Sequence, residues 1–344
     1  MHSEVLVHVI RGETVESIHR GHIFVVDGEG KTVVSIGDPL TVTYFRSAAK
    51  PFQAMPLITS GAADAFGFSD DEIAMAIASH SGEKMHVDRV AQMLEKIGLA
   101  ESDLRCGVHA PFYTREAERM LREGETPTQL HNNCSGKHAG MLALAKHIGA
   151  DIATYDTTEN RVQKRVLRCV SDFTGVSEDK IAICIDGCAA PNFAVSVESM
   201  AKSFASLVFP LNFHTTFQSA AKRIVQAMMK YPELIGGTDR LDTMLMQTAP
   251  GKIISKVGAD GVWLCGVLPS EKYPTGLGLA LKVEDGDDHR GRPVVAVEIL
   301  RRLEVLSSND LPELSPMPIK NRRGDLVGKV ESAAFKAGEF RSLD

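Results

Sequence analysis

The sequence has no block of lysine or arginine residues. Its 344 residues carry 38 basic and 44 acidic side chains, for a formal net charge of −6. Proteins that bind nucleic acids present clustered positive charge to the phosphate backbone. We therefore expect no nucleic-acid partner, and small-molecule chemistry becomes the favoured class of function.

Long hydrophobic runs are also missing. Charged residues or glycine interrupt the apolar stretches well before the roughly 20 residues that a membrane-spanning helix needs. The first apolar stretch, residues 5–10, is too short for the core of a secretory signal and follows Glu4 instead of a basic segment. We expect a cytoplasmic protein without membrane association.

The composition contains little that indicates disorder or a fibrous repeat. Hydrophobic residues make up 44%, charged residues 24% and aromatic residues 6%, which is close to the average of soluble globular proteins. At roughly 150 residues per domain, the chain is long enough for one large domain or two ordinary ones. The six cysteines are predicted to be reduced thiols, either buried or used in metal binding or catalysis.

Turn residues and hydrophobic periodicity divide the chain into strands, helices and strands again. Two β-branched runs around Asp-Gly-Glu-Gly at 27–30 predict a hairpin over 22–37. Ser69 and Glu72 form a capping-box pattern ahead of a helix that begins at residue 73. Further helices are predicted at about 137–147, 161–170, 194–207, 214–229 and 294–306, and further strands at 40–45, 181–185, 262–267 and 277–283. This order predicts an α+β fold, in which an antiparallel sheet built from both chain ends carries packed helices.

Ser47 and Lys50 follow the predicted strand 40–45 directly. On one helical turn the two side chains share a face, so a neutral lysine could take the serine proton and activate it as a nucleophile. Pro51 cannot donate a hydrogen bond to the carbonyl of Ser47, and it biases Lys50 away from helical backbone. The alternative interpretation is the first turn of a helix with a solvated lysine.

A second hydroxyl cluster, Ala-Ser-His-Ser-Gly-Glu at 78–83, ends the helix that begins at residue 73. Serine and glycine are ordinary at a helix end unless another feature draws the loop into a site. Lys256-Val257-Gly258 loosely resembles the Lys-Thr-Gly element that accompanies Ser-x-x-Lys in penicillin-recognising enzymes. A penicillin-recognising serine hydrolase is thus one alternative function, although its Ser-x-Asn and Lys-Thr-Gly elements are missing in their usual form.

Spacing also makes Cys134, His138, Cys184 and Cys188 candidates for a zinc site. Cys134 and His138 are one helical turn apart, the other two thiols lie at the end of a predicted strand, and sulfur and imidazole suit tetrahedral zinc. Neither half has the Cys-x-x-Cys spacing, so buried thiols remain the competing interpretation. A non-catalytic zinc-binding protein is the second alternative function.

Five segments with these residues follow one another along the chain. They read Arg-Ser-Ala-Ala-Lys-Pro-Phe-Gln at 46–53, Ala-Ser-His-Ser-Gly-Glu at 78–83, His-Asn-Asn-Cys-Ser-Gly-Lys-His at 131–138, Asp-Gly-Cys-Ala-Ala-Pro at 186–191 and Lys-Val-Gly-Ala-Asp-Gly at 256–261. Together with segments 278–286 and 321–328, they resemble the motifs of the rhizobial-type L-asparaginase family over nearly the whole chain. The resemblance implies one asparaginase domain over residues 1–344, with a helical subdomain expected at about 60–250. It also implies a homodimer and a fold similar to that of serine β-lactamases and glutaminases.

The same resemblance implies an amidohydrolase that converts L-asparagine to L-aspartate and ammonia. Its matching positions give two Ser–Lys pairs, Ser47 with Lys50 and Ser79 with Lys256. Arg46 and Asp186 would lie close to the substrate. Ser47 is favoured as the nucleophile because its lysine is nearest in sequence, but Ser79 could attack instead, with Ser47 relaying the proton.

Zinc is the cofactor that the resemblance implies, with Cys134, Lys137 and Cys188 as its ligands. This set shares two cysteines with the set inferred from spacing. Lysine binds a metal only as a neutral amine, so the metal must hold its pKa far below the ordinary value near 10. Spacing alone does not select Lys137 over His138.

Overall fold

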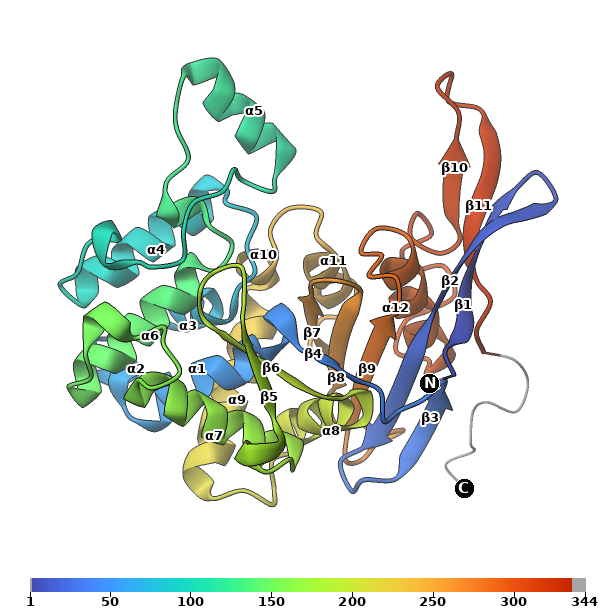
Figure 1. The fold of residues 1–344 in the computed structure, drawn as a ribbon. Coiled ribbons are helices and arrows are strands. Elements are labelled where there is room, and N and C mark those ends of the chain that lie inside the picture. The colour runs from blue at the N-terminus through green and yellow to red at the C-terminus, as the bar shows by residue number, and fades with distance from the viewer. Residues whose placement is uncertain (1, 336–344) are drawn as a thin grey trace. The chain divides into compact units, whose positions relative to one another are not determined.

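The structure is a computed structural model that describes residues 2–335 (Figure 1). The chain forms two compact units. The first unit comprises Met1–Ala48, Ala194–Phe209 and Met244–Asp344, and the second comprises Ala49–Phe193 and Pro210–Thr243. Within the described residues, no helix has the length and apolar character to span a bilayer.

An eight-stranded sheet is the centre of the first unit. Its order is β10-β11-β1-β2-β9-β8-β7, with β3 also paired to β2, and the pairings are antiparallel. The N-terminal strands therefore lie between late strands of the chain. The strands are β1 (Glu4–Arg11), β2 (Thr14–Asp27), β3 (Thr32–Ile36), β7 (Ile253–Gly258), β8 (Val262–Val267), β9 (Leu277–Val283), β10 (Met317–Lys320) and β11 (Leu326–Ser332).

Helices α8 (Val197–Val208) and α12 (Gly291–Arg302) cover the sheet. A Cβ atom at Gly278 on β9 would overlap the backbone of Ala201 and Ala205, so α8 packs directly on that position. Val283, five residues further along β9, lies against the start of α12. Because successive side chains of a strand point to opposite faces, the two helices cover opposite faces, and β7 and β8 are buried throughout.

The second unit is mainly helical, and α6 lies at its centre. This helix packs against α1, α2, α3, α4 and α7 and is buried from Ser135 to Ala145. The helices are α1 (Lys50–Thr59), α2 (Ala62–Ala65), α3 (Asp70–Ile77), α4 (Lys84–Lys96), α5 (Thr114–Glu123), α6 (Ser135–Ile148), α7 (Arg161–Thr174), α9 (Thr215–Lys230) and α10 (Pro232–Ile235), followed by α11 (Leu241–Thr248), which runs into the first unit. Strand β5 (Ala182–Ile185) also belongs to this unit.

Local sequence signals fix several helix ends as predicted. Ser69 and Glu72 form the capping box of α3, with the Ser69 N–H donating to Glu72 Oε2 at 2.8 Å. Gly149 takes the left-handed conformation, with φ of 62°, directly after α6. Such caps satisfy backbone groups that a helix end leaves without partners.

Residues 191–196 correct the sequence prediction. We expected a helix over 194–207, but strand β6 (Pro191–Ser196) comes first and α8 begins at Val197. Ser196 is the N-cap, because its Oγ accepts a hydrogen bond from the Ser199 N–H at 3.1 Å. A cap residue has extended backbone, which lets the preceding residues pair with β4 (Val42–Tyr44).

Smaller differences concern element ends. The strand predicted at 40–45 is limited to β4, α12 begins and ends earlier than predicted, and β10 and β11 are strands that the sequence did not indicate. The α+β class and the antiparallel sheet built from both chain ends are confirmed.

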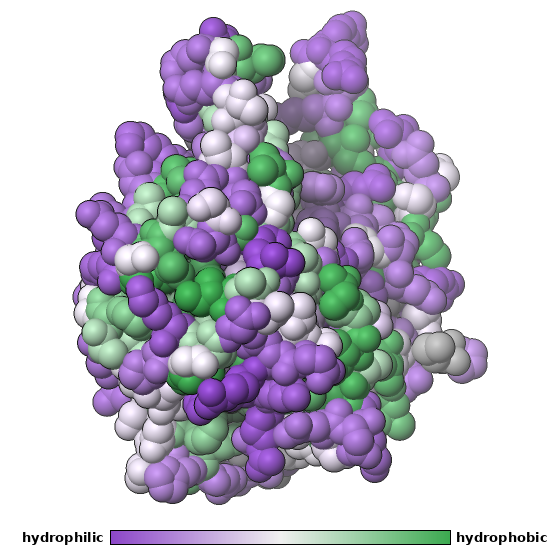
Figure 2. Space-filling model, turned by 60° about the vertical axis from the view of Figure 1, so that its left-hand side comes forward, coloured by the Kyte–Doolittle hydropathy of each residue, from purple (hydrophilic) through white to green (hydrophobic). Residues whose placement is uncertain are grey.

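Hydrophilic residues predominate on the face of the molecule shown in Figure 2, with smaller hydrophobic areas between them. Single exposed apolar side chains are normal on soluble proteins. Among the described residues, the most exposed large ones are Leu121, Leu326, Leu40 and Val42. Leu40 and Val42 are neighbours around the start of β4, whereas Leu121 and Leu326 lie in other segments.

The contact of Gly278 with α8 predicts a marked loss of stability in Gly278→Ala. The new methyl group would meet helix backbone, which cannot move aside as a side chain can, and overpacking of this kind costs about 1–3 kcal/mol or more. Denaturant unfolding measures the change. Gly187→Ala is the control, since a Cβ there meets no atom within 4 Å. Equal stability of the two variants would contradict the packing of α8 on β9.

Candidate functional site

Lys50 and Ser79 meet inside the second unit, although they are 29 residues apart in sequence. Lys50 is the first residue of α1, and Ser79 lies just after α3. Lys50 Nζ is 2.7 Å from Ser79 Oγ, and the two residues are only 1% and 4% exposed. The structure thus forms a Ser–Lys pair that sequence spacing did not indicate.

Two backbone carbonyls complete the surroundings of the Lys50 amine. Nζ donates to the oxygen of Ala78 at 2.6 Å and to that of Asn133 at 3.3 Å. Burial lowers the pKa of Lys50 and outweighs the opposite effect of Cys134 and Cys188, and the charge of Lys137 lowers it further. A neutral amine has one lone pair and needs a donor for it. The Ser79 hydroxyl and the thiol of Cys134, which also hydrogen-bonds to Lys50, both carry a proton. At 2.7 Å, a neutral Lys50 could act as a base toward Ser79.

His80 braces the loop that carries Ser79, a role that sequence reasoning missed. Its ring is fully buried, and burial holds its pKa well below the ordinary value. Ser135 Oγ donates to the carbonyl of Leu130, so it accepts from His80 Nε2 at 2.9 Å, while Nδ1 accepts from the Gly82 N–H. The only sequence signal was a histidine between two serines at a helix end.

Arg46 and Ser47 lie in the first unit, on the short 3-10 turn Arg46–Ala49 after β4. Arg46 has a left-handed backbone, with φ of 51°, and its guanidinium donates to Asp260 Oδ2 at 2.8 Å. Ser47 is partly exposed. A Cβ at Gly258 would overlap the carbonyl of Phe45, so the end of β7 lies directly against this segment.

Lys256 lies on β7, opposite Leu264 of β8, and is completely buried. Burial of a lysine on a strand is unusual, and it sets Lys256 apart from an ordinary surface cation. The pairs Ser47 with Lys50 and Ser79 with Lys256 join residues of different units. Both pairs stay predictions.

Cys134, Lys137 and Cys188 form a polar cluster in the second unit. Cys134 and Lys137 stand at the start of α6, and Lys137 Nζ is 3.0 Å from Cys188 Sγ in the loop after β5. A hydrogen bond from the Cys134 thiol and the Lys137 charge lower the pKa of Cys188. Burial alone would lower the pKa of Lys137, but the two sulfur atoms raise it above its ordinary value. The cluster therefore holds a thiolate beside an ammonium group.

His138 points its Nδ1 at Tyr155, with 2.7 Å between Nδ1 and the phenol oxygen. That oxygen accepts a hydrogen bond from the Arg105 N–H, so the phenol proton goes to His138 Nδ1. The other ring nitrogen, Nε2, is buried on the side of Cys188. In residues 2–335, no three His, Cys, Asp or Glu side chains are grouped as a metal site of these residue types requires. The structure therefore does not assemble the set Cys134, His138, Cys184 and Cys188 that spacing suggested, and the zinc ligands stay a prediction.

Asp186 begins the loop that carries Cys188. Its N–H donates to the Ala190 carbonyl at 2.9 Å, and its Oδ1 accepts from the Gly187 N–H at 2.8 Å. Ala189 has a left-handed backbone, with φ of 67°, so the loop is a tight turn. The turn sets the Asp186 carboxylate two residues from Cys188, where its charge reaches Lys137.

A sequence model described as L-asparaginase II matches residues 7–332. No match was found among curated proteins. A Bacillus subtilis glutaminase in covalent complex with 5-oxo-L-norleucine is 14% identical, with coverage of 83% of this chain and 89% of that chain and a TM-score of 0.39. A Bacillus glutaminase is 14% identical (83% and 92%, TM-score 0.38), and Mglu in its tris and glutamate form is 16% identical (84% and 60%, TM-score 0.38).

Burial should make the cysteines react at different rates with a thiol reagent. Burial raises the pKa of Cys169 on α7 to about 12, whereas Cys184 is partly exposed, and only the thiolate reacts. At pH 8 we expect iodoacetamide to modify Cys184 in the folded protein and Cys169 only after unfolding. Peptide mass mapping measures both. Equal native rates would mean that α7 does not bury Cys169.

Proposed function

The chain belongs to the L-asparaginase II family, a family of amidohydrolases, and from this premise we propose that it hydrolyses L-asparagine to L-aspartate and ammonia. The observation that carries the proposal is the buried contact of Lys50 Nζ with Ser79 Oγ. A serine activated by a neutral lysine supplies the nucleophile and the base that amide hydrolysis needs.

In the proposed reaction, Lys50 removes the hydroxyl proton of Ser79 as its oxygen attacks the side-chain amide carbon of the substrate. The tetrahedral intermediate collapses when Lys50 returns that proton to the leaving nitrogen, which departs as ammonia. Water then attacks the acyl-enzyme ester with Lys50 again as base, releasing L-aspartate and restoring Ser79. Sequence proximity favoured Ser47 as the nucleophile, whereas the hydrogen bond to Lys50 favours Ser79.

The remaining predicted residues receive roles that fit their charges. Arg46 is proposed to bind the substrate's α-carboxylate, because a guanidinium group binds carboxylates with two parallel hydrogen bonds. Asp186 is proposed to bind the α-ammonium group. Ser47 and Lys256 are proposed as the second Ser–Lys pair, and the burial of Lys256 supports a role other than a surface charge.

We also propose that Cys134, Lys137 and Cys188 hold a zinc ion. The thiolate character of Cys188 and its contact with Lys137 support this set, since zinc prefers sulfur and nitrogen ligands. Bound zinc would act as a Lewis acid that helps to orient the substrate. Lys137 and Cys134 would each give up a proton on binding. The zinc ion would then take the place of the proton that the Lys137 amine now shares with Cys188.

Both alternative functions make different predictions. A penicillin-recognising hydrolase would act on β-lactams, and a non-catalytic zinc-binding protein would release no ammonia from any amide. A coupled ammonia assay with L-asparagine, L-glutamine and a penicillin distinguishes the three. The cytoplasmic location and the homodimer stay predictions.

Loss of the Ser–Lys groups should abolish catalysis and leave the fold intact. We expect Ser79→Ala, Lys50→Met and Lys256→Met each to lower ammonia release from L-asparagine by roughly a thousandfold or more. When catalytic groups act as a unit, removal of one lowers the rate almost as much as removal of all. Ser47→Ala tests the second serine. Lys164→Met, at an exposed lysine on α7, is the control. Near-normal turnover in both serine variants would contradict the proposed mechanism.

Elemental analysis should find about one zinc ion per chain in protein prepared without chelator. We expect Cys134→Ala and Cys188→Ala to lose the metal, and His138→Ala to keep it because Lys137 is the proposed nitrogen ligand. Cys169→Ala is the control thiol. Removal of zinc should raise KM more than it lowers kcat, as expected for a group that orients substrate. Metal-free protein, or loss of zinc in His138→Ala alone, would contradict this ligand set.

A further inference from the structure

Ser79 lies on irregular backbone between α3 and α4, so helix hydrogen bonds do not hold it. Its position depends on a second stretch of chain, residues 233–238, which runs beside residues 79–86. The Ser79 N–H donates to the Ile235 carbonyl at 2.9 Å. We call the set of contacts between these two segments the clasp.

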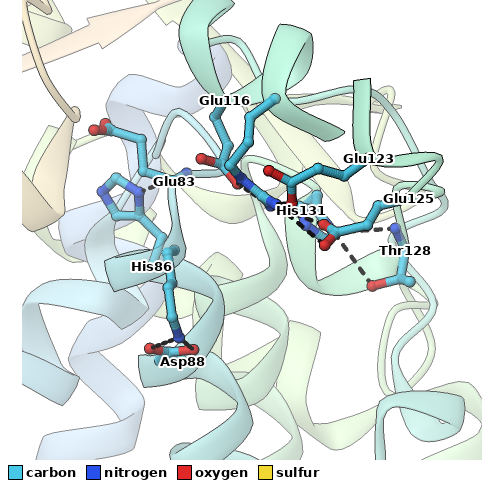
Figure 3. A network of polar contacts seen from close by, with 10 residues as sticks. Glu83, His86, Asp88, Glu116, Glu123, Glu125, Thr128 and His131 are labelled. Carbon is cyan, nitrogen blue, oxygen red and sulfur yellow. Dashed lines mark hydrogen bonds and ion pairs between the residues drawn. The ribbon is translucent and has the colours of Figure 1, made fainter. Parts of the chain in front are cut away.

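Glu83 and Thr238 form the contact of the clasp that is farthest from Ser79 along the chain. Glu83 Oε1 accepts from the Thr238 N–H at 2.8 Å, and Oε2 accepts from the Thr238 hydroxyl at 2.6 Å. Both carboxylate oxygens are thus used by one residue. The Glu83 N–H in turn donates to His86 Nδ1 (Figure 3), so His86 Nε2 carries the proton that it donates to the Glu233 carbonyl at 3.0 Å.

The middle of the clasp has no room for another side chain. Ser81 Oγ donates to the Gly236 carbonyl at 2.9 Å. Gly237 has φ of +112°, and a Cβ there would come within 2.5 Å of Ser81 Oγ and 2.7 Å of Glu83 Oε1. The approach of the two segments therefore requires glycine at 237, both for its backbone conformation and for space.

We propose that Glu83 and Thr238 are positioning residues that hold Ser79 against Lys50 by closing the clasp. The inference rests on the proposed function, in which Ser79 and Lys50 do the chemistry. A displacement of about 1 Å at a reacting group can lower a rate by roughly a hundredfold. The clasp acts on the Ser79 backbone through Ile235, and neither Glu83 nor Thr238 needs to touch the substrate.

Paired variants of the two residues test the clasp. Thr238→Val keeps the shape and removes the hydroxyl donor, and Glu83→Ala removes both acceptors. We expect each to lower kcat by roughly ten- to a hundredfold, with KM changed less than about twofold because substrate binding is intact. The double variant should lose little more than either single one, since both break the same contact.

Conservative variants should rescue the activity. Thr238→Ser keeps the hydroxyl. In Glu83→Gln the amide oxygen can accept from the Thr238 N–H while its NH₂ donates to the Thr238 oxygen, so kcat should return to within about threefold of the parent. The control is Asp88→Asn on the same helix (Figure 3), where the exposed pair with Lys84 is lost but the clasp is not touched.

Hydrogen exchange of the peptide 78–86 gives a readout that does not depend on catalysis. We expect Thr238→Val to accelerate exchange there and to leave α6 and α7 unchanged. If the parent protein releases no ammonia from either amide, the proposed function fails while exchange still tests the clasp. Unchanged kcat or unchanged exchange in Thr238→Val and Glu83→Ala would overturn the proposal, as would losses that follow general unfolding in a thermal melt.

Discussion

The hydrogen bond between Lys50 and Ser79 is the interaction on which the site depends. A lysine inside a protein core is unfavourable unless its protons find acceptors or its charge is given up. Here two carbonyls, one hydroxyl and the Cys134 thiol surround the amine, and burial lowers its pKa. Exclusion of water is thus both the cost of burying this residue and the property on which its proposed role as a base depends.

A second buried lysine shows how neighbours reverse that outcome. Lys137 is as deeply buried as Lys50, yet the sulfur atoms beside it raise its pKa instead of lowering it. Cys134 and Cys188 raise the pKa of both lysines, but burial outweighs them at Lys50, whereas at Lys137 the direct contact with Cys188 prevails. Burial and neighbouring sulfur therefore shift the two buried lysines in opposite directions.

Short-range features of the fold could be predicted from the sequence better than the pairing of side chains far apart along the chain. Capping signals such as Ser69 with Glu72 and turn glycines such as Gly149 act over a few residues, and the structure follows them. The contact of Lys50 with Ser79 depends on how α1 and α3 pack, which no spacing rule contains. The hydrogen bond between His138 Nδ1 and Tyr155 is likewise tertiary, as is the contact of Lys137 with Cys188, and local spacing contains neither.

The sheet of the first unit has a consequence for how the chain folds as it is synthesised. β2 must pair with β9, with Gly21 opposite Val283, and β1 must pair with β11. On the ribosome the first hairpin leaves the exit tunnel long before its partners exist, and the helices of the second unit are made in between. Contacts of such high sequence separation form slowly, and unpaired strand edges aggregate. In newborn chains β1 and β2 thus remain without these partners until the last third of the chain has been made.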